Sequence, residues 1–281
     1  MDTLRTERRP ADEYGAIFEP STKGRFFPTP LARGPWDPNA LHGGAVAGLF
    51  AHALEQHEFD AEQFVARLTI ELLRPVPLRP LVMKLSTVRP GRKVTWIDAE
   101  LRTDEGDLVA CARALRVQRF ATERFDVGDA AIAPVEPIPG PDSVPEAPIG
   151  ISDQIGFWNA QEFRLVKGDW IQPGPGAAWF RLLIPIAAGH TLTQLERVAA
   201  AADFGGGVGN PVRGSKAGTI NAELTIHLHR PAAGHWVGLD SRAWAHPQGG
   251  AMCESVLHDV DGGVGRCSQA MVVVADVPWD R

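Results

Sequence analysis

The amino-acid sequence contains two related segments separated by a constant offset of 156 residues. Arg67–Pro75 (RLTIELLRP) aligns with Glu223–Pro231 (ELTIHLHRP), and six of the nine positions are identical. Ordinary residue frequencies would give roughly one identity at most. The same offset aligns four further pairs: Gly106 with Gly262, Cys111 with Cys267, Ala114 with Ala270 and Val117 with Val273. The sequence therefore predicts two copies of one supersecondary unit, each of which buries its apolar face against the other.

Composition limits the class of protein. The chain has 281 residues, 44% of them apolar and 22% charged, which fits a globular protein of about two domains. The net charge of −6 gives no sign of a nucleic-acid surface, and no apolar run approaches the roughly 18 residues of a membrane span. The first ten residues lack the apolar core of a secretory signal, and the three cysteines show no CxxC spacing. We expect a cytoplasmic protein without nucleic-acid or membrane partners.

A proline-rich stretch separates the two copies. Six prolines fall between Pro134 and Pro148, and such a composition favours an extended, semi-rigid linker. We therefore expect an N-terminal subdomain at residues 1–126, a linker at 127–155 and a C-terminal subdomain at 156–281.

Both copies show the same order of elements. Copy one is predicted to contain a strand, a buried helix rich in small residues, and four more strands, at 24–31, 42–55, 68–75, 81–89, 94–103 and 108–120. Copy two is predicted to contain two strands, a helix with a capping-box start, and four strands, at 161–166, 177–184, 193–203, 220–229, 236–244, 250–258 and 264–274. A long helix in the curve of an antiparallel sheet is the hotdog fold. We expect an α+β double hotdog with the sheets joined edge to edge and the helices packed together.

Three polar side chains occur in copy two but not at the matching positions of copy one. Asn221 aligns with Val65, Gln269 aligns with Arg113, and Asp203 ends a helix that is otherwise nearly all apolar. Buried charges and amides are rarely unpaired, so these three side chains are expected to cluster. We interpret Asp203, Asn221 and Gln269 as a candidate site near the cleft between the subdomains, in which the carboxylate of Asp203 would activate a water.

Structural roles are the alternative for each residue of this group. Asp203 could accept hydrogen bonds from the amides of Gly205–Gly207 at the end of its helix. Asn221 heads a row of alternating polar residues that continues through Glu223 and Thr225. A single amide in a strand is more often structural, and only the combination favours a site.

The start of the helix in copy one could bind substrate. His42 is followed by Gly43 and Gly44, and glycines at a helix start let a ligand oxygen approach free N–H groups. Such amides suit a carbonyl that develops oxyanion character. The alternative is that the glycines only allow close packing of helix and sheet. His227 and His229 share a strand face without further ligands at a zinc spacing, so we expect no metal ion and no cofactor.

The sequence resembles the type II-like acyl-CoA thioesterase family of bacterial double-hotdog enzymes. The resemblance rests on Leu41–Gly44, Thr69–Pro75, Asn221–Pro231 and Gly265–Ala270. That family places an aspartate on the second helix, a threonine or serine at the start of the following strand, and a glutamine on the last strand. Asp203 and Gln269 match this pattern, whereas Asn221 stands where the family has a hydroxyl.

The resemblance implies direct hydrolysis of an acyl-CoA thioester in fatty-acid metabolism by a homo-oligomer. It also implies that Asp203, Asn221 and Gln269 form a catalytic group that holds a water, with Asp203 as the base. Two alternatives remain. An acyl-thioester hydratase or dehydratase would need a histidine beside a carboxylate, and the strand pattern places no histidine near Asp203. A non-catalytic acyl-CoA or lipid-binding protein would fit the departure at Asn221. Release of free thiol distinguishes the hydrolase from both.

Overall fold

The computed structural model describes residues 13–58, 60–119, 137–147, 149, 154–212 and 217–275. Copy one contains β1 (Phe18–Pro20), β2 (Arg25–Pro28), α1 (Gly43–Gln56), β3 (Gln63–Leu72), β4 (Leu81–Arg89), β5 (Val94–Thr103) and β6 (Leu108–Gln118). Copy two contains β7 (Gln161–Lys167), β8 (Gly176–Leu182), α2 (Gln194–Ala202), α3 (Gly205–Val208), β9 (Ala217–Leu228), β10 (Val237–Ala245), β11 (Gly250–Asp259) and β12 (Gly262–Ala275). Short 3₁₀ turns lie at Thr22–Gly24, Pro30–Ala32, Pro141–Ser143 and Phe157–Ala160.

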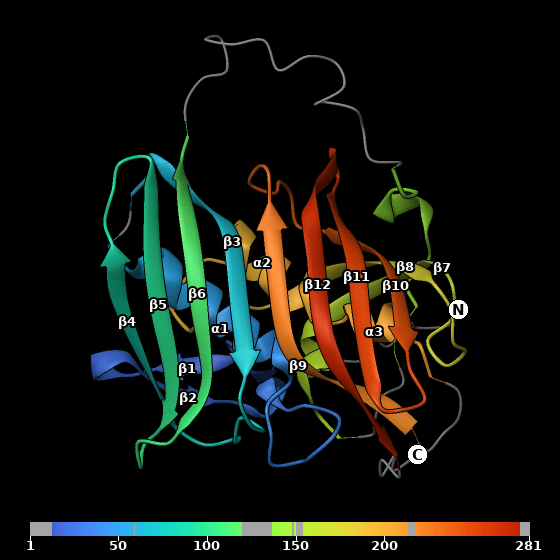
Figure 1. Ribbon diagram of the computed structural model, residues 1–281, viewed down its shortest axis with the longest axis horizontal. Coiled ribbons are helices and arrows are strands. Elements are labelled where there is room, and N and C mark those ends of the chain that lie inside the picture. The colour runs from blue at the N-terminus through green and yellow to red at the C-terminus, as the bar shows by residue number, and fades with distance from the viewer. Residues whose placement is uncertain are drawn as a thin grey trace, which may run out of the picture.

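The strands form one curved sheet with the two long helices against one of its faces (Figure 1). The strand order is β1-β2-β4-β5-β6-β3-β9-β12-β11-β10-β8-β7, which reads as the same six-strand arrangement from either edge. At the centre, β3 and β9 pair antiparallel with Thr69 opposite Thr225, and the two hydroxyl oxygens lie 3.1 Å apart. These residues are 156 apart in the sequence, so a local twofold axis passes between them. The predicted double hotdog with edge-to-edge sheets is confirmed.

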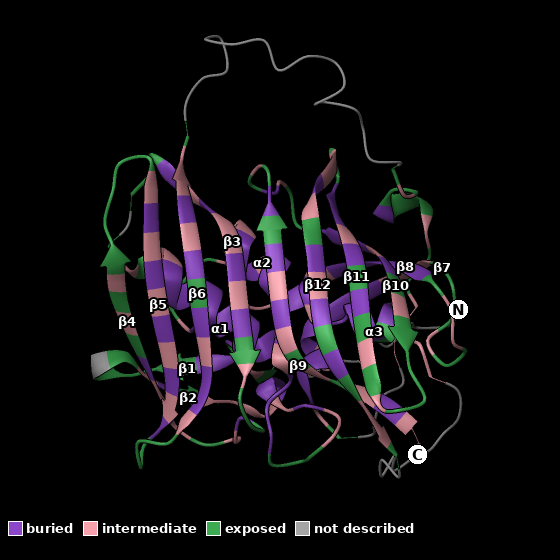
Figure 2. Ribbon diagram, in the orientation of Figure 1, coloured by how far each residue is buried: buried purple, intermediate pink, exposed green. Residues whose placement is uncertain are grey.

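The helices pack antiparallel against each other and against the inner face of the sheet. Glycines make this close approach possible, because a Cβ on Gly44 would lie 2.6 Å from the carbonyl oxygen of Ala200. The side chains between helices and sheet form one continuous apolar core. Burial therefore alternates along the strands, as in β5, where every second residue is buried (Figure 2). The antiparallel packing places the start of α1 beside the end of α2, where the candidate site lies.

The offset between the copies changes in the last strand. Thr69 pairs with Arg113 on β6, whereas its counterpart Thr225 pairs with Ser268 on β12, so these strands match at an offset of 155. The cause is the preceding hairpin: Thr103 and Asp107 close a loop of three residues, whereas Asp259 and Gly262 close a loop of two.

The predicted alignment of Gln269 with Arg113 is therefore wrong by one residue. Gln269 pairs with Leu224, and the counterpart of Leu224, Leu68, pairs with Ala114. Both Gln269 and Ala114 are buried, whereas Arg113 is exposed. The other matches in these strands, such as Cys111 with Cys267, shift in the same way.

About half of the proposed linker at 127–155 lies outside the described residues, and the subdomain boundaries remain predictions. The described part of it contacts copy two. The carbonyl of Pro139 accepts a hydrogen bond from the indole of Trp179, and the N–H of Ala147 donates to the carbonyl of Phe163.

Candidate active site

Asp203 is the C-cap of α2, and its carboxylate points at the N-terminus of α1. The Nδ2 of Asn221 donates to Oδ1 of Asp203 at 2.7 Å, and Nδ1 of His42 lies 3.0 Å from Oδ2. The side chain of Asp203 is only 7% exposed, so these contacts are made away from bulk water. The expected alternative, bonding of Asp203 to the Gly205–Gly207 amides, does not occur, because these glycines form the separate helical turn α3.

Gly43 is the residue that lets the carboxylate reach the helix. A Cβ at this position would lie 2.5 and 2.7 Å from the two carboxylate oxygens of Asp203, far inside normal contact distance. The N–H of Gly43, at the first position of α1, has no acceptor among the described residues. The first N–H groups of a helix carry partial positive charge and attract negative oxygen. Gly43 therefore offers a free donor directly beside the carboxylate.

His42 caps α1 and faces Asp203 at the same time. Its Nδ1 lies 2.9 Å from the N–H of Gly44 and 3.0 Å from Oδ2 of Asp203. The nitrogen accepts from Gly44 when it carries no proton and donates to Asp203 when it does. The expectation that no histidine lies near Asp203 is therefore wrong. The strand pattern missed this pair because it forms between the helices of different copies.

The pKa of Asp203 lies below its ordinary value. Burial would raise this pKa, but the hydrogen bonds and charge of His42, the amide of Asn221 and the N–H of Gly44 favour the ionised form more strongly. Asp203 is therefore a carboxylate at neutral pH. Of the roughly four acceptor positions on a carboxylate, Asn221, His42 and Gly44 use three, so one remains for a water or a substrate.

A β-bulge turns Asn221 toward Asp203. In the pairing of β9 with β12, Glu223 lies opposite Ala270 and Asn221 lies opposite Met271, which leaves Ala222 as an extra residue. Such a bulge reverses the alternation of side chains and is common beside active sites. Asn221 therefore lies on the inner face and is not in one row with Glu223 and Thr225, as the uninterrupted alternation had predicted. Copy one has the same bulge at Ala66, which points Val65 inward.

Gln269 contacts the backbone of Asp203. It is 2% exposed, and its Nε2 donates to the main-chain oxygen of Asp203 at 3.1 Å. Asn221 donates to the same oxygen, also at 3.1 Å. In the part of the chain that the structure describes, Oε1 of Gln269 has no partner. Gln269 therefore bonds to the backbone at the end of α2, and the structure shows no hydrogen bond between its side chain and the carboxylate of Asp203.

A cavity of about 500 Å³ opens beside this cluster. Four of the six predicted site residues line the cavity: His42, Gly43, Asp203 and Asn221. The other two, Gly44 and Gln269, are not part of its lining. Most of the remaining wall is apolar and includes Leu41, Val46, Leu72, Val76, Phe204, Ile220 and Val272. Sequence reasoning missed Trp36, Trp170 and Arg74, which also line the cavity. Only Arg74 had a detectable signal, as part of the repeated Arg-Pro pair.

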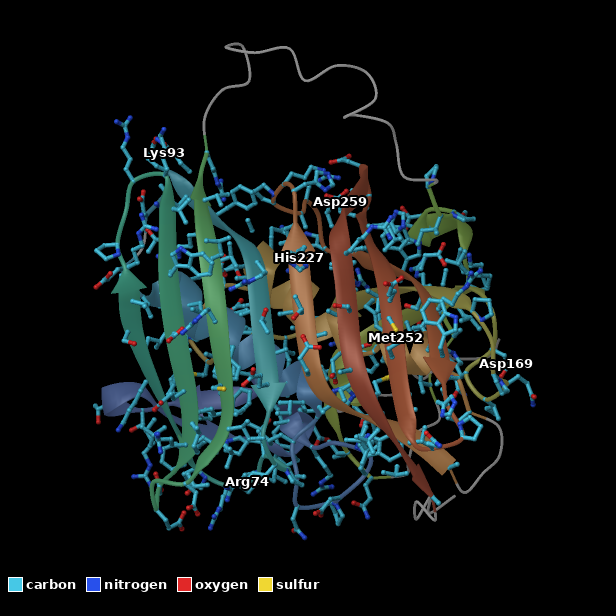
Figure 3. All side chains as sticks on the ribbon, in the orientation of Figure 1. Arg74, Lys93, Asp169, His227, Met252 and Asp259 are labelled. Atoms are coloured by element: carbon cyan, nitrogen blue, oxygen red, sulfur yellow. The ribbon has the colours of Figure 1, made fainter. Side chains whose placement is uncertain are left out.

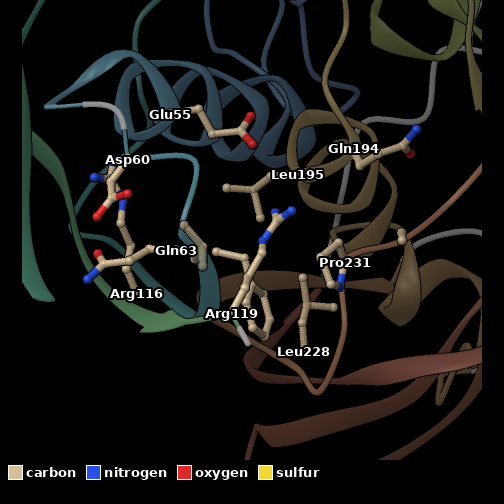
Figure 4. A pocket seen from close by; sticks show the side chains of 12 residues that line it. Glu55, Asp60, Gln63, Arg116, Arg119, Gln194, Leu195, Leu228 and Pro231 are labelled. Atoms are coloured by element: carbon tan, nitrogen blue, oxygen red, sulfur yellow. The ribbon is translucent and has the colours of Figure 1, made fainter. Parts of the chain in front are cut away.

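The opposite ends of the same helices form a related but different pocket (Figure 4). Its volume is about 270 Å³, and its lining includes Glu55, Val65 and Leu228. Glu55 at the end of α1 accepts a hydrogen bond from Thr193, the N-cap of α2, just as Asp203 contacts the N-cap of α1. However, Val65 stands where copy two has Asn221. This end therefore has a carboxylate without its amide partner.

Comparison with known families identifies the family of this chain. Residues 32–117 match the acyl-CoA thioesterase N-terminal domain, and residues 133–273 match the acyl-CoA thioesterase C-terminal domain. The second match alone spans half of the chain. The chain belongs to the acyl-CoA thioesterase family. It is therefore an enzyme that hydrolyses thioester bonds, and the non-catalytic alternative is not supported.

Solved structures agree on the fold of this thioesterase. A protein of Alicyclobacillus acidocaldarius described as having a hot dog fold superposes with a TM-score of 0.69 at 18% identity, covering 91% of this chain and 95% of the other. The tesB protein of Mycobacterium avium gives 0.64 at 14% identity, covering 92% and 95%. Acyl-CoA thioesterase II TesB2 of Mycobacterium marinum gives 0.62 at 15% identity, covering 83% and 90%. No curated protein matches the chain in sequence.

None of the helices described in the structure has the length and apolar character needed to cross a bilayer.

Proposed function

We propose that the protein hydrolyses an acyl-CoA thioester to a free acid and coenzyme A with water activated by Asp203. The observation that carries this proposal is the position of the ionised Asp203 beside the free N–H of Gly43 on the wall of a largely apolar cavity. A carboxylate can orient a water, a helix N-terminal amide can stabilise a developing oxyanion, and apolar walls suit an acyl chain.

The proposed reaction needs no covalent intermediate. Asp203 and Asn221 hold the water, and its oxygen attacks the thioester carbonyl while Asp203 accepts one proton. The carbonyl oxygen becomes negative against the N–H of Gly43. The C–S bond then breaks, and coenzyme A leaves as a thiolate that takes up the proton. Gln269 acts indirectly, because it fixes the backbone of Asp203. Gly44 also acts indirectly, since its N–H serves His42 and Asp203.

A hydratase reaction is the second candidate, and the contact between His42 and Asp203 is the observation that favours it. A histidine paired with a carboxylate can move a proton at the α carbon of an acyl thioester. The family favours hydrolysis. An enoyl-CoA substrate separates the two reactions, because hydration removes the conjugated double bond without free thiol, whereas hydrolysis releases thiol.

A panel of acyl-CoAs of different chain length and branching, assayed for released thiol, tests the proposed function. We expect turnover for at least one aliphatic chain that fits the cavity. Binding without thiol release across the whole panel would contradict the proposal.

We also propose that the protein self-associates and acts in the cytoplasm in fatty-acid metabolism. Self-association is inferred from the resemblance to the family, with closed symmetry as the default arrangement, and light scattering at micromolar concentration checks it.

A further inference from the structure

We infer that Arg74 is a subsite for the phosphate groups of the coenzyme A carrier. This inference rests on the proposed function, because it places the carrier at the mouth of the same cavity. Arg74 follows the end of β3 and lines the cavity that contains Asp203 and Gly43. It is exposed at the lower end of the molecule in Figure 3.

The two copies of the repeat use this arginine differently. Arg230, the counterpart of Arg74, forms a two-pronged ion pair with Asp259, with nitrogen–oxygen distances of 2.5 and 2.8 Å. Asp259 is fully buried and also accepts the N–H groups of Ala233 and Asp261. The pKa of Arg230 is raised by this hydrogen-bonded carboxylate. In copy two, the arginine is therefore a structural residue.

Copy one lacks the acid that would neutralise Arg74. The strands β5 and β11 match at an offset of 156, since Ala99 pairs with Leu85 as Ser255 pairs with Ser241. The position of Asp259 is thus occupied by Thr103, which cannot carry a charge. Two acids of the same hairpin are taken by other arginines, since Asp104 pairs with Arg25 and Glu105 with Arg79, and the structure shows no ion pair between the third, Asp107, and Arg74.

Arg74 consequently has no hydrogen bond or ion pair within the described residues. Asp37 also lines the cavity, but the structure shows no ion pair between the two, and Oδ1 of Asp37 accepts the N–H of Asn39. A guanidinium group binds phosphate through two parallel N–H donors. With the thioester at Asp203 and the acyl chain against the apolar walls, the carrier must leave through the mouth, where Arg74 offers the free positive charge.

The inference is tested with one acyl group carried on two thiols, coenzyme A and pantetheine, which has no phosphate. Arg74→Gln should raise KM for the acyl-CoA about tenfold to a hundredfold, the range for a lost hydrogen bond to a charged group, and leave KM for the acyl-pantetheine unchanged. kcat should stay within about twofold for both, because Arg74 does not touch the reacting atoms. Arg79→Gln is the matched control: it removes the same charge from an exposed arginine outside the cavity, and both KM values should stay as in the wild type.

Calorimetric titration with free coenzyme A separates this inference from the proposed function. The wild type should bind coenzyme A more tightly than Arg74→Gln does, whether or not it hydrolyses the thioester. Added salt should weaken binding to the wild type more than to the variant. Equal affinity of both proteins for coenzyme A, or an equal effect of Arg74→Gln on both thioesters, would overturn the inference. If no thioester is hydrolysed but the expected difference in affinity is found, the proposed hydrolysis is contradicted and the inference about Arg74 stands.

Discussion

At the scale of single residues, Gly43 is where the site tolerates an added atom least. We expect Gly43→Ala to lower kcat/KM at least about a hundredfold, because the methyl group would displace the Asp203 carboxylate. Stability should not fall to the same extent, since alanine favours a helix over glycine by up to about 1 kcal/mol. Thiol-release kinetics and thermal unfolding together check this. Gly15→Ala is the control, since a Cβ there meets nothing within 4 Å, and equal losses in both variants would contradict the account.

His42 is expected to keep Asp203 ionised. Asparagine is a good helix N-cap, so His42→Asn should preserve the start of α1 while it removes the imidazole beside the carboxylate. The pKa of Asp203 should then rise, because burial is offset less. The proposed base works only when ionised, so the acid limb of the profile of kcat/KM against pH should move to higher pH. An unshifted acid limb would mean that His42 does not act on Asp203.

The members of the polar cluster could be predicted from the sequence more accurately than the contacts between them. Asp203 and Asn221 stood out because copy one lacks their polarity, and the structure brings them within 2.7 Å. The contact of His42 with Asp203 could not be predicted from strand patterns, because it depends on how the two helices pack. The two matched arginines also differ in role, since Arg230 is paired with an acid and Arg74 is not. This difference depends on Asp259, which lies on another strand, β11.

At the scale of elements, the repeat predicted the strands and the fold. Two local irregularities, however, changed the face of the sheet on which individual side chains lie. The bulge at Ala222 turns Asn221 inward, and one fewer loop residue before β12 shifts Gln269 by one position relative to copy one. A shift of one residue moves a side chain to the other face of a sheet. Both changes leave the apolar alternation of the rest of each strand intact, so the pattern alone does not reveal them.

The far ends of the helices give a prediction about stability. Burial raises the pKa of Glu55 from 4.5 to about 7, although Thr193 donates a hydrogen bond to it. A carboxyl group with a raised pKa in the folded protein stabilises the fold fully below the unfolded pKa, and this stabilisation is lost as pH rises through the folded pKa. Between about pH 4.5 and 7, the wild type should therefore lose about 3 kcal/mol relative to Glu55→Gln. Denaturant unfolding at several pH values measures this difference, and parallel curves for both proteins would contradict it.

At the scale of the whole molecule, duplication has produced two unequal halves around one local twofold axis. Each end of the helix pair has a carboxylate against the N-cap of the opposite helix, but only the end with Asp203 combines it with an inward amide and the larger cavity. Both halves are needed for that end, since His42 and Gly43 come from copy one and Asp203, Asn221 and Gln269 come from copy two. The subdomains are therefore expected to be inactive when separated.

The most direct test of the account is the thiol-release rate of Asp203→Asn on the best acyl-CoA of the panel. Asparagine keeps the volume and removes the charge, so kcat should fall by about 10² to 10⁴, while coenzyme A binding and unfolding stay close to the wild type. Glu55→Gln makes the matching change at the other end of the helices and should retain full activity. Wild-type rates in Asp203→Asn, or an equal loss in Glu55→Gln, would contradict the assignment of the site.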